Sequence, residues 1–268
     1  MAKIAQALTI AGSDSGGGAG IQADLKTFQM RGVFATCAIT AITAQNTLDV
    51  FDIHPIPIPM IQAQIKAVAE DFTINAVKIG MLGNAEIIEC VAESLAHYGF
   101  RQIVLDPVMI AKGGAPLLQQ NAIAALKQYM LPKADIITPN LPEAEALTGI
   151  RIVNQKTARH AAEILQALGA KTVVIKGGHS MQSQSAVCLD RIFTPHNEFN
   201  LESPRYLTQH THGTGCTFSA CITAELAKGY STEQAIRTAK KFITAAIRHP
   251  LNIGNGHGPT NHWAYQYE

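Results

Sequence analysis

Cysteine is scarce in this sequence, and the few cysteines present follow no recognisable pattern. The 268 residues include five cysteines, an odd number, with no Cys-x-x-Cys pair and no Cys/His cluster at zinc spacing. Such usage argues against a disulfide framework and against a structural metal site. A reducing compartment fits this composition better than an oxidising one, and we expect the protein to be cytoplasmic.

An excess of charge of either sign is also missing. Lysine plus arginine number 21 and aspartate plus glutamate 20, so the net charge is +1 and the pI is near 7.7. This balance gives no electrostatic case for a nucleic acid or an anionic membrane as a partner. It suits a protein that binds a small molecule.

Long hydrophobic runs are absent too. The apolar run near the N-terminus, residues 7–12, is too short for a signal peptide and is typical of a first strand. No other stretch reaches the length needed to span a membrane. With 47% hydrophobic and 15% charged residues, the chain is nevertheless apolar enough to bury a substantial core.

Two common nucleotide-binding motifs are absent from this sequence. The glycine-rich residues 12–20 follow the first strand and precede a helix marked by Ile21, Leu25 and Phe28, an order that recurs in phosphate sites. No Gly-Lys-Ser/Thr follows, which excludes a P-loop. Ile21 occupies the position of the third glycine of the dinucleotide fingerprint, which argues against a dinucleotide oxidoreductase. The loop is free to close over a small ligand instead.

Strands and helices alternate along the chain. We expect strands over 6–11, 33–43, 76–80, 103–105, 136–138 and 172–176, and later helices over 61–72, 84–97, 119–130, 155–168, 218–226 and 231–248. This alternation predicts βαβ units and a parallel sheet. Residues 48–59 should add a short edge strand, and 185–193 with 198–203 an antiparallel hairpin. We predict one α/β domain over 1–268, because no repeat or linker is visible.

The most informative stretch is THGTGCTF, residues 211–218. Gly213 and Gly215 open a helix, so its unpaired N–H groups and the positive end of its dipole would form an anion site. Thr214 and Cys216 lie in the same turn, where the pKa of a thiol tends to fall. The alternative is an ordinary capped helix start in which Cys216 is buried packing.

Polar side chains follow several expected strands: Asp106, Asn140, Glu143 and Lys176. Because the carboxyl ends of parallel strands share one edge of a sheet, we expect these groups to converge there. Two carboxylates and an amide beside an anion turn suit a hydrated Mg²⁺ that bridges the phosphates of a nucleotide. The alternatives are that Asp106 terminates a strand and that Glu143 complements a helix dipole.

Three other polar residues leave two interpretations open. Gln45 either meets the edge of a heterocycle with its amide or caps the end of a strand. Asp24 either points into a pocket or is an exposed carboxylate at a helix start. Lys112 lies in the loop 107–116, where Gly113-Gly114 would allow a lid, and it either reaches a phosphate or stays solvated.

Seven stretches, in order along nearly the whole chain, resemble the hydroxymethylpyrimidine/phosphomethylpyrimidine kinases of thiamin biosynthesis. They are residues 7–28, 43–47 (TAQNT), 78–82 (KIGML), 105–109 (LDPVM), 137–147 (ITPNLPEAEAL), 176–179 (KGGH) and 211–220. The resemblance implies a ribokinase-like α/β fold with a central, mostly parallel sheet flanked by helices. It also implies ATP-dependent phosphorylation of 4-amino-5-hydroxymethyl-2-methylpyrimidine, and then of its monophosphate to the diphosphate.

The resemblance also assigns roles to individual residues. The pyrimidine pocket would be lined by Gly12, Asp24, Thr43, Gln45, Met81 and Val108, although family members carry valine where Thr43 stands. Asp106 and Glu143 would serve Mg²⁺; Asn140, Lys176, Thr211 and Gly213 would bind ATP; and Gly213, Thr214, Gly215 and Cys216 would form the catalytic anion hole. Cys216 replaces the aspartate base of the wider superfamily. A homodimer follows by the same analogy, and a need for a monovalent cation stays open.

Two other functions remain as alternatives. A pyridoxal, pyridoxine or pyridoxamine kinase would share the fold and also phosphorylates a hydroxymethyl group, although Gln45 and Met81 favour the pyrimidine. A ligand sensor without catalytic activity would keep the pocket, but it would not need the metal and anion-hole positions. Consumption of ATP distinguishes the enzymes from the sensor.

Overall fold

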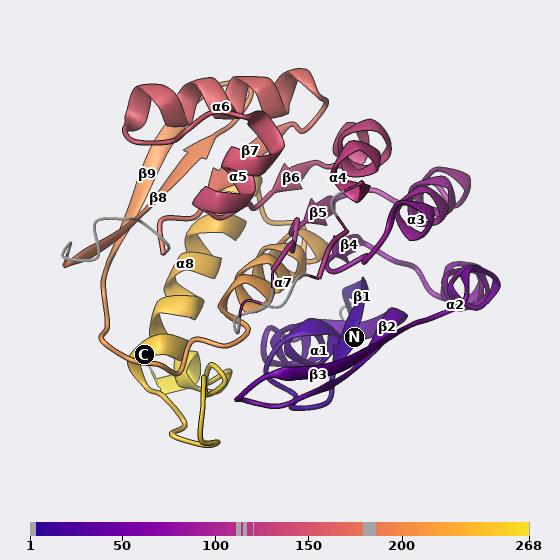
Figure 1. Ribbon diagram of the computed structural model, residues 1–268, viewed down its shortest axis with the longest axis horizontal. Coiled ribbons are helices and arrows are strands. Elements are labelled where there is room, and N and C mark those ends of the chain that lie inside the picture. Colours follow the sequence, from indigo (N-terminus) through magenta and orange to yellow (C-terminus); the bar gives the residue numbers. More distant parts are fainter. Residues whose placement is uncertain (1–3, 111–113, 115–116, 120, 179–185, 268) are drawn as a thin grey trace.

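The computed structural model describes residues 4–110, 114, 117–119, 121–178 and 186–267, and these residues form one nine-stranded sheet (Figure 1). In spatial order the strands are β3 (Val50–Pro55), β2 (Phe34–Gln45), β1 (Gln6–Asp14), β4 (Ala76–Ile79), β5 (Ile103–Leu105), β6 (Ile136–Ile137), β7 (Thr172–Ile175), β8 (Val187–Phe193) and β9 (Glu198–Pro204). The six strands from β2 to β7 run parallel. The edge strand β3 and the β8–β9 hairpin are antiparallel. The predicted fold class is therefore confirmed.

Helices cover both faces of the sheet. Those in the described residues are α1 (Gly20–Met30), α2 (Ile58–Asp71), α3 (Ala85–His97), α4 (Ala122–Ala125), α5 (Leu141–Thr148), α6 (Gln155–Ala167), α7 (Thr214–Ala227) and α8 (Thr232–Arg248), with a short terminal turn at Ala264–Tyr267. One core cluster joins the sheet to α2–α6, and a second joins it to α1, α7 and α8 (Figure 1). Alternate residues of β5 divide between them, because Ile103 and Leu105 belong to the first cluster and Val104 to the second.

Several element boundaries differ from those expected. β1 continues to Asp14 because it keeps pairing with β2 past a register shift between Ala11 and Ser13. β2 continues to Gln45 because its last two residues pair with β3. The glycine-rich loop therefore begins only after Asp14. The helix expected near 119–130 starts at Ala122, widens into a π turn and ends in a 3₁₀ turn at Lys133.

No helix among the described ranges is long and apolar enough to cross a membrane. The longest helix, α8, is strongly amphipathic: Phe242 packs in the core, whereas Glu233 and Arg237 form an ion pair at the surface. Its composition is that of a helix which covers one face of a sheet.

The first prediction concerns the core under β1. Leu8 is fully buried in the cluster beneath α2–α6, so Leu8→Ala should lower the free energy of unfolding by about 2–5 kcal/mol. The matched control is Leu48→Ala, whose side chain is 57% exposed and whose effect should stay within about 0.5 kcal/mol. Urea denaturation of both variants measures the difference. Equal effects would mean that β1 does not form the centre of this core.

Candidate active site

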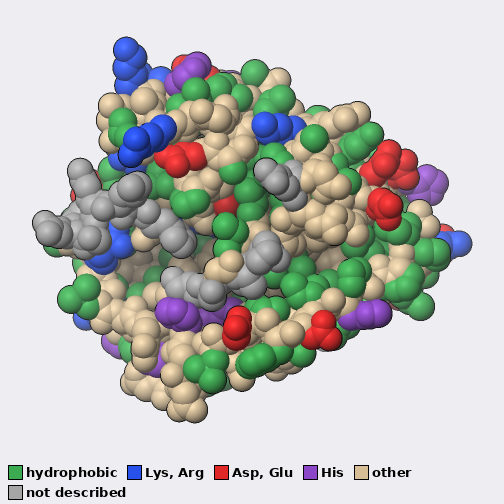
Figure 2. Space-filling view, in the orientation of Figure 1, with side chains coloured by type: hydrophobic (Ala, Val, Ile, Leu, Met, Phe, Trp, Pro, Cys, Tyr) green, Lys and Arg blue, Asp and Glu red, His purple; other side chains and the backbone are tan. Residues whose placement is uncertain are grey.

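A cavity of about 740 Å³ opens at the carboxyl ends of the parallel strands. It is lined by all but one of the site residues expected from the sequence: Gly12, Thr43, Gln45, Met81, Asp106, Val108, Asn140, Glu143, Lys176, Thr211, Gly213, Thr214, Gly215 and Cys216. The exception is Asp24. The predicted convergence of strand-end residues at one sheet edge is thus confirmed. On the face shown in Figure 2, basic and acidic side chains are scattered over the surface, in keeping with the net charge of +1.

Two glycine-rich loops pack against each other at the cavity. Gly213 has a φ of +80°, and a Cβ there would lie 1.8 Å from the carbonyl oxygen of Gly18. A Cβ at Gly18 would in turn lie 2.5 Å from Cδ2 of His212. Only glycine permits this approach of backbone to backbone. The contact fixes the start of α7 relative to the loop that precedes α1.

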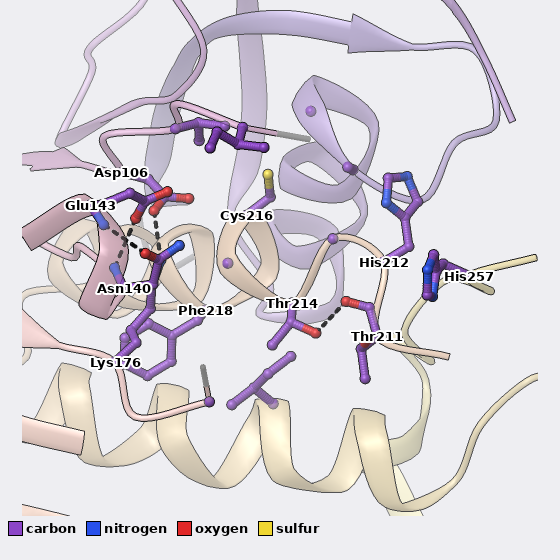
Figure 3. Close-up of a pocket in the computed structure, with 18 of the residues that line it drawn as sticks. Asp106, Asn140, Glu143, Lys176, Thr211, His212, Thr214, Cys216, Phe218 and His257 are labelled. Atoms are coloured by element: carbon purple, nitrogen blue, oxygen red, sulfur yellow. Dashed lines mark hydrogen bonds and ion pairs between the residues drawn. The ribbon is translucent and has the colours of Figure 1, made fainter. Parts of the chain in front are cut away.

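The start of α7 is built to receive an anion. Gly213 is the N-cap residue and supplies no capping side chain, and the first turn contains no acidic residue. Thr214 Oγ1 donates to the carbonyl oxygen of Thr211 at 2.6 Å, which turns this hydroxyl toward its own loop (Figure 3). The helix start therefore has neither a capping side chain nor an acidic residue in its own first turn, and its dipole faces the cavity.

A buried ion pair lies beside this helix start. Lys176 Nζ is 2.8 Å from Asp106 Oδ1, and Thr138 and Ser219 donate to the same carboxylate at 3.2 and 3.3 Å. Burial favours the neutral acid, but the charges of Lys176 and Lys78 outweigh it and hold the pKa of Asp106 below its ordinary value. Asp106 is therefore a carboxylate at neutral pH.

Gly215 leaves room for this pair. A Cβ at Gly215 would lie 3.2 Å from Lys176 Nζ and 3.4 Å from Asp106 Oδ2, in the tightest range of real contacts. The lysine ammonium and the N–H groups of α7 thus face the same part of the cavity. A phosphate group that entered it would meet both.

Asn140 and Glu143 form a capping box at the start of α5. Asn140 Oδ1 accepts from the Glu143 N–H at 2.9 Å, and Glu143 Oε2 accepts from the Asn140 N–H at 2.8 Å. Burial, together with the nearby charge of Asp106, raises the pKa of Glu143 to about 7 despite the opposing charge of Lys176. The helix-start role considered from the sequence is therefore present, and the same carboxyl group also lines the cavity.

Cys216 lies between the charged cluster and His212 (Figure 3). Its sulfur accepts a hydrogen bond from the Gly20 N–H, but burial, with the charges of Asp24 and Asp106, raises the pKa of the thiol to about 11. The attraction of Lys78 only partly offsets this effect. The prediction of a lowered thiol pKa is therefore wrong: Cys216 is mainly a neutral thiol at pH 7 in the unliganded chain.

Asp24 requires a correction as well. Its side chain is fully buried rather than exposed, and it lies behind the cavity wall instead of lining it. Asp24 Oδ2 accepts from Thr9 Oγ1 at 2.6 Å and from Lys78 Nζ at 2.9 Å. Lys78, which the sequence analysis passed over, lines the cavity in its place. A lysine inside the short apolar strand 76–79 was the signal that could have found it.

Gln45 ends β2 and occupies the opposite end of the cavity from Lys176. Its backbone closes onto Ser15, whose Oγ donates to the Gln45 carbonyl at 2.6 Å and accepts from its N–H at 2.8 Å. The side-chain amide contacts Thr43 and His212. Met81 lies against Gly12, where a Cβ would be 3.0 Å from Sδ. His212, missed from the sequence, stands between the two conspicuous residues Thr211 and Gly213.

Lys112 and most of the loop 111–116 lie outside the described residues, as does His179. Within the described part of the chain, no three His, Cys, Asp or Glu residues gather closely enough to hold a metal ion on their own.

Comparison with known proteins agrees with this geometry. The chain matches the family model described as phosphomethylpyrimidine kinase over residues 14–261. The hydroxymethylpyrimidine/phosphomethylpyrimidine kinase of Haemophilus influenzae is 69% identical over 99% of either chain, and that of Bacillus subtilis 52% over 98% of this chain and 96% of its own. The solved ADP complex of Bacillus subtilis pyridoxal kinase has a TM-score of 0.90 at 39% identity, covering 99% of this chain and 100% of that chain. The chain, with its ribokinase-like fold, therefore belongs to the phosphomethylpyrimidine kinase family.

Proposed function

We propose that this chain is an ATP-dependent kinase of thiamin biosynthesis. It phosphorylates 4-amino-5-hydroxymethyl-2-methylpyrimidine and then the resulting monophosphate. The observation that carries the proposal is the single cavity in which Lys176 stands at one end, the amide of Gln45 at the other, and an uncapped helix start between them. Such a cavity has room for a phosphate donor and a small ring together.

The phosphate end suits ATP. Lys176 and the N–H groups of Gly213 to Cys216 supply positive charge and donors for the phosphates, while Asn140 and Thr211 line the same wall. Asp106 orients the lysine through its 2.8 Å ion pair. The related Bacillus subtilis pyridoxal kinase was solved with ADP bound, which supports a nucleotide as the ligand of this fold.

The other end suits the pyrimidine. An amide can donate to a ring nitrogen and accept from the neighbouring exocyclic amine, so Gln45 matches the edge of an aminopyrimidine. Met81, Val108 and Gly12 add an apolar and close-fitting wall, and Thr43 lies beside Gln45. The two relatives at 69% and 52% identity bear the name of the pyrimidine kinase, whereas the pyridoxal kinase stands at 39%. The pyrimidine is therefore the preferred substrate.

Mg²⁺ would be held by Asp106 and Glu143 together with water and phosphate oxygens. The donor set fits, because two buried carboxyl groups face the cavity and the charge of one raises the pKa of the other. Mg²⁺ usually keeps several waters and takes few protein ligands, so two carboxylates suffice. When bound, the ion supplies neutralisation of phosphate charge. A need for a monovalent cation, left open by the sequence, is not part of this proposal.

Cys216 would accept the proton of the substrate hydroxyl. The hydroxymethyl oxygen forms a bond to the γ-phosphorus, the bond from phosphorus to the ADP oxygen breaks, and the hydroxyl proton passes to the thiolate. With a thiol pKa near 11, the thiolate fraction at pH 7 is on the order of 10⁻⁴. Because the transition state is loose, positioning and charge neutralisation carry most of the rate, and proton removal comes late.

The remaining predictions concern organisation. We propose that residues 1–268 act as one kinase domain, since both core clusters share a single sheet. We also propose a homodimer; the exposed apolar side chains Ile42 and Phe51 on the edge of the sheet formed by β2 and β3 support an interface there. A cytoplasmic location stays a prediction.

An ATP-coupled assay with Mg²⁺ tests the function directly. The pyrimidine, its monophosphate and pyridoxal are offered in parallel, and we expect turnover of both pyrimidines with slow turnover of pyridoxal. Turnover of pyridoxal alone would assign the enzyme to vitamin B6 salvage. Measurable pyrimidine binding without ATP consumption would identify a ligand sensor.

The role of Cys216 is tested by Cys216→Ser. A serine hydroxyl ionises far less readily than a thiol, so it is rarely available as an anion at neutral pH, and kcat should fall by about 10²–10⁴-fold while the KM for ATP changes little. Cys37→Ser is the control, because Cys37 does not line the cavity. Near-normal kcat in a folded Cys216→Ser enzyme would rule out the base role and leave the α7 backbone to carry the step.

The raised pKa of Glu143 predicts how the stability of the fold changes with pH. Its pKa is raised from 4.5 to about 7, so the folded state holds a proton that the unfolded state has lost, and stability falls as pH rises from 4.5 through 7. Glu143→Gln keeps a capping oxygen and removes this penalty. The variant should therefore gain more Tm relative to wild type at pH 8 than at pH 5, measured without metal or nucleotide.

The control for this comparison is Glu89→Gln, whose exposed side chain lies on α3 away from the cavity and which should show no such trend. A Glu143→Gln variant that loses stability equally at both pH values would show that the carboxyl group serves only as a helix cap.

A further inference from the structure

Asp190 and Lys240 have no part in the function proposed so far, although both line the cavity. Asp190 lies on β8 and Lys240 on α8, and the two residues are only 6% and 8% exposed. Lys240 Nζ donates to Asp190 Oδ2 at 2.8 Å. Because the two charges balance, the pair adds no net charge to the cavity, and its role must be sought in what else it contacts.

The second oxygen of Asp190 holds the end of β7. Asp190 Oδ1 accepts from the Gly177 N–H at 2.8 Å. The paired residues of β7 and β8 end at Ile175 and Arg191, so the carboxylate supplies a partner where the ladder of backbone hydrogen bonds stops. Gly177 also packs directly on β8, because a Cβ there would lie 1.9 Å from the Leu189 carbonyl oxygen.

Lys176 is therefore held through the backbone on both sides. Its own N–H donates to the Pro139 carbonyl at 2.9 Å, and the next N–H along the chain, that of Gly177, donates to Asp190. Successive N–H groups of a strand point to opposite neighbours, so these two hydrogen bonds flank the Lys176 Cα. The base of the lysine side chain thus has one fixed position.

A fixed base matters for Lys176 because its side chain is long and its ammonium has more than one partner. Lys176 Nζ reaches Asp106 Oδ1 at 2.8 Å (Figure 3), and a phosphate in the cavity would share the hydrogens of the same ammonium. A base displaced by about 1 Å would bring the ammonium to the phosphate from another direction, and phosphoryl transfer is sensitive to displacements of this size.

We propose that Asp190 is a positioning residue for Lys176 and that Lys240 keeps Asp190 in place. The Asp190 carboxylate fixes the Gly177 N–H, and with it the backbone from which Lys176 extends to the phosphates of ATP. The Lys240 ammonium neutralises this buried carboxylate, which would be costly to leave unpaired. The inference rests on the proposed function in one respect, namely that Lys176 contacts those phosphates.

Two double variants test the inference, and both contain Lys240→Met so that no buried charge is left without its partner. The asparagine pair, Asp190→Asn with Lys240→Met, keeps an oxygen that can accept from Gly177, and its kcat should stay within about threefold of wild type. The leucine pair, Asp190→Leu with Lys240→Met, has no such acceptor. Its kcat should fall by about 10–100-fold, with a smaller change in the KM for the pyrimidine.

A double-mutant cycle with Lys176 separates positioning from a general defect. In calorimetry with ATP and Mg²⁺, the leucine pair should bind ATP about tenfold more weakly than the asparagine pair. When Lys176→Met is added to both, this difference should fall below about twofold, because no lysine remains to be displaced. A difference that persists without Lys176 would overturn the inference. So would equal binding by the two pairs; if both bound ATP weakly, the Lys240 ammonium would itself bind the nucleotide.

The chain offers a matched control at the opposite end of the sheet. Asp135 Oδ2 accepts from the Ile103 N–H at 2.8 Å, and Asp135 Oδ1 accepts from Lys171 Nζ at 2.6 Å. Neither Asp135 nor Lys171 lines the cavity. Asp135→Asn and Asp135→Leu, each combined with Lys171→Met, should therefore bind ATP with equal affinity, even where their Tm values differ.

Hydrogen exchange of the Gly177 amide, measured without nucleotide, tests the role of Asp190 independently of the function. Exchange should be slow in wild type and in the asparagine pair, and at least about tenfold faster in the leucine pair. Equal exchange in all three proteins would overturn the inference, whereas wild-type protein that bound no ATP would contradict the proposed function. If the leucine pair failed to fold, as judged by circular dichroism, Asp190→Ala with Lys240→Met would replace it in each comparison.

Discussion

The site depends on the contact between two backbones at Gly18 and Gly213. No side chain fits between them, since a Cβ at Gly213 would lie 1.8 Å from the Gly18 oxygen. This contact brings the N-termini of α1 and α7 to the same point, although nearly two hundred residues separate them in the sequence. The Gly20 N–H can then reach the sulfur of Cys216. Removing the contact would separate the loop before α1 from the start of α7.

The sequence predicts the architecture well because hydrophobic periodicity is a local property. Short apolar runs separated by amphipathic helices mark β4, β5, β6 and β7 at nearly their observed bounds. The ends of β1 and β2 were less predictable. β1 extends three residues further because β2 offers partners across a register shift, as in the pair Asp14–Thr43. β2 extends two residues further because these residues pair with β3. Pairing of this kind depends on two distant segments, and no window along one of them reveals it.

The candidate site, too, could be predicted from the sequence only in part. Residues at strand ends and at the glycine turn could be assigned to one cavity, because the topology of a parallel sheet brings those ends together. The pKa of Cys216 could not be inferred, because the local helix start suggests a lowered value while burial near Asp24 and Asp106 raises it. The surroundings of Asp24, on α1, were predicted wrongly because its partner Lys78 comes from a distant strand, β4. No pattern in the sequence singles out His212, because its contacts with Asp14 and Gln45 arise only in the folded chain.

The C-terminal segment has a consequence for biosynthesis. The backbone of His212 pairs with Gly258 and Thr260, and the Gly256 N–H donates to Thr47 Oγ1 at 3.2 Å. The loop before α7 and the turn after β2 are thus both tied to residues 256–260, which follow the nine strands and α8 in the sequence. The sheet can therefore form during translation before the loop before α7 has these backbone partners. The order of synthesis delays the final ordering of this loop until residues 256–260 have been made.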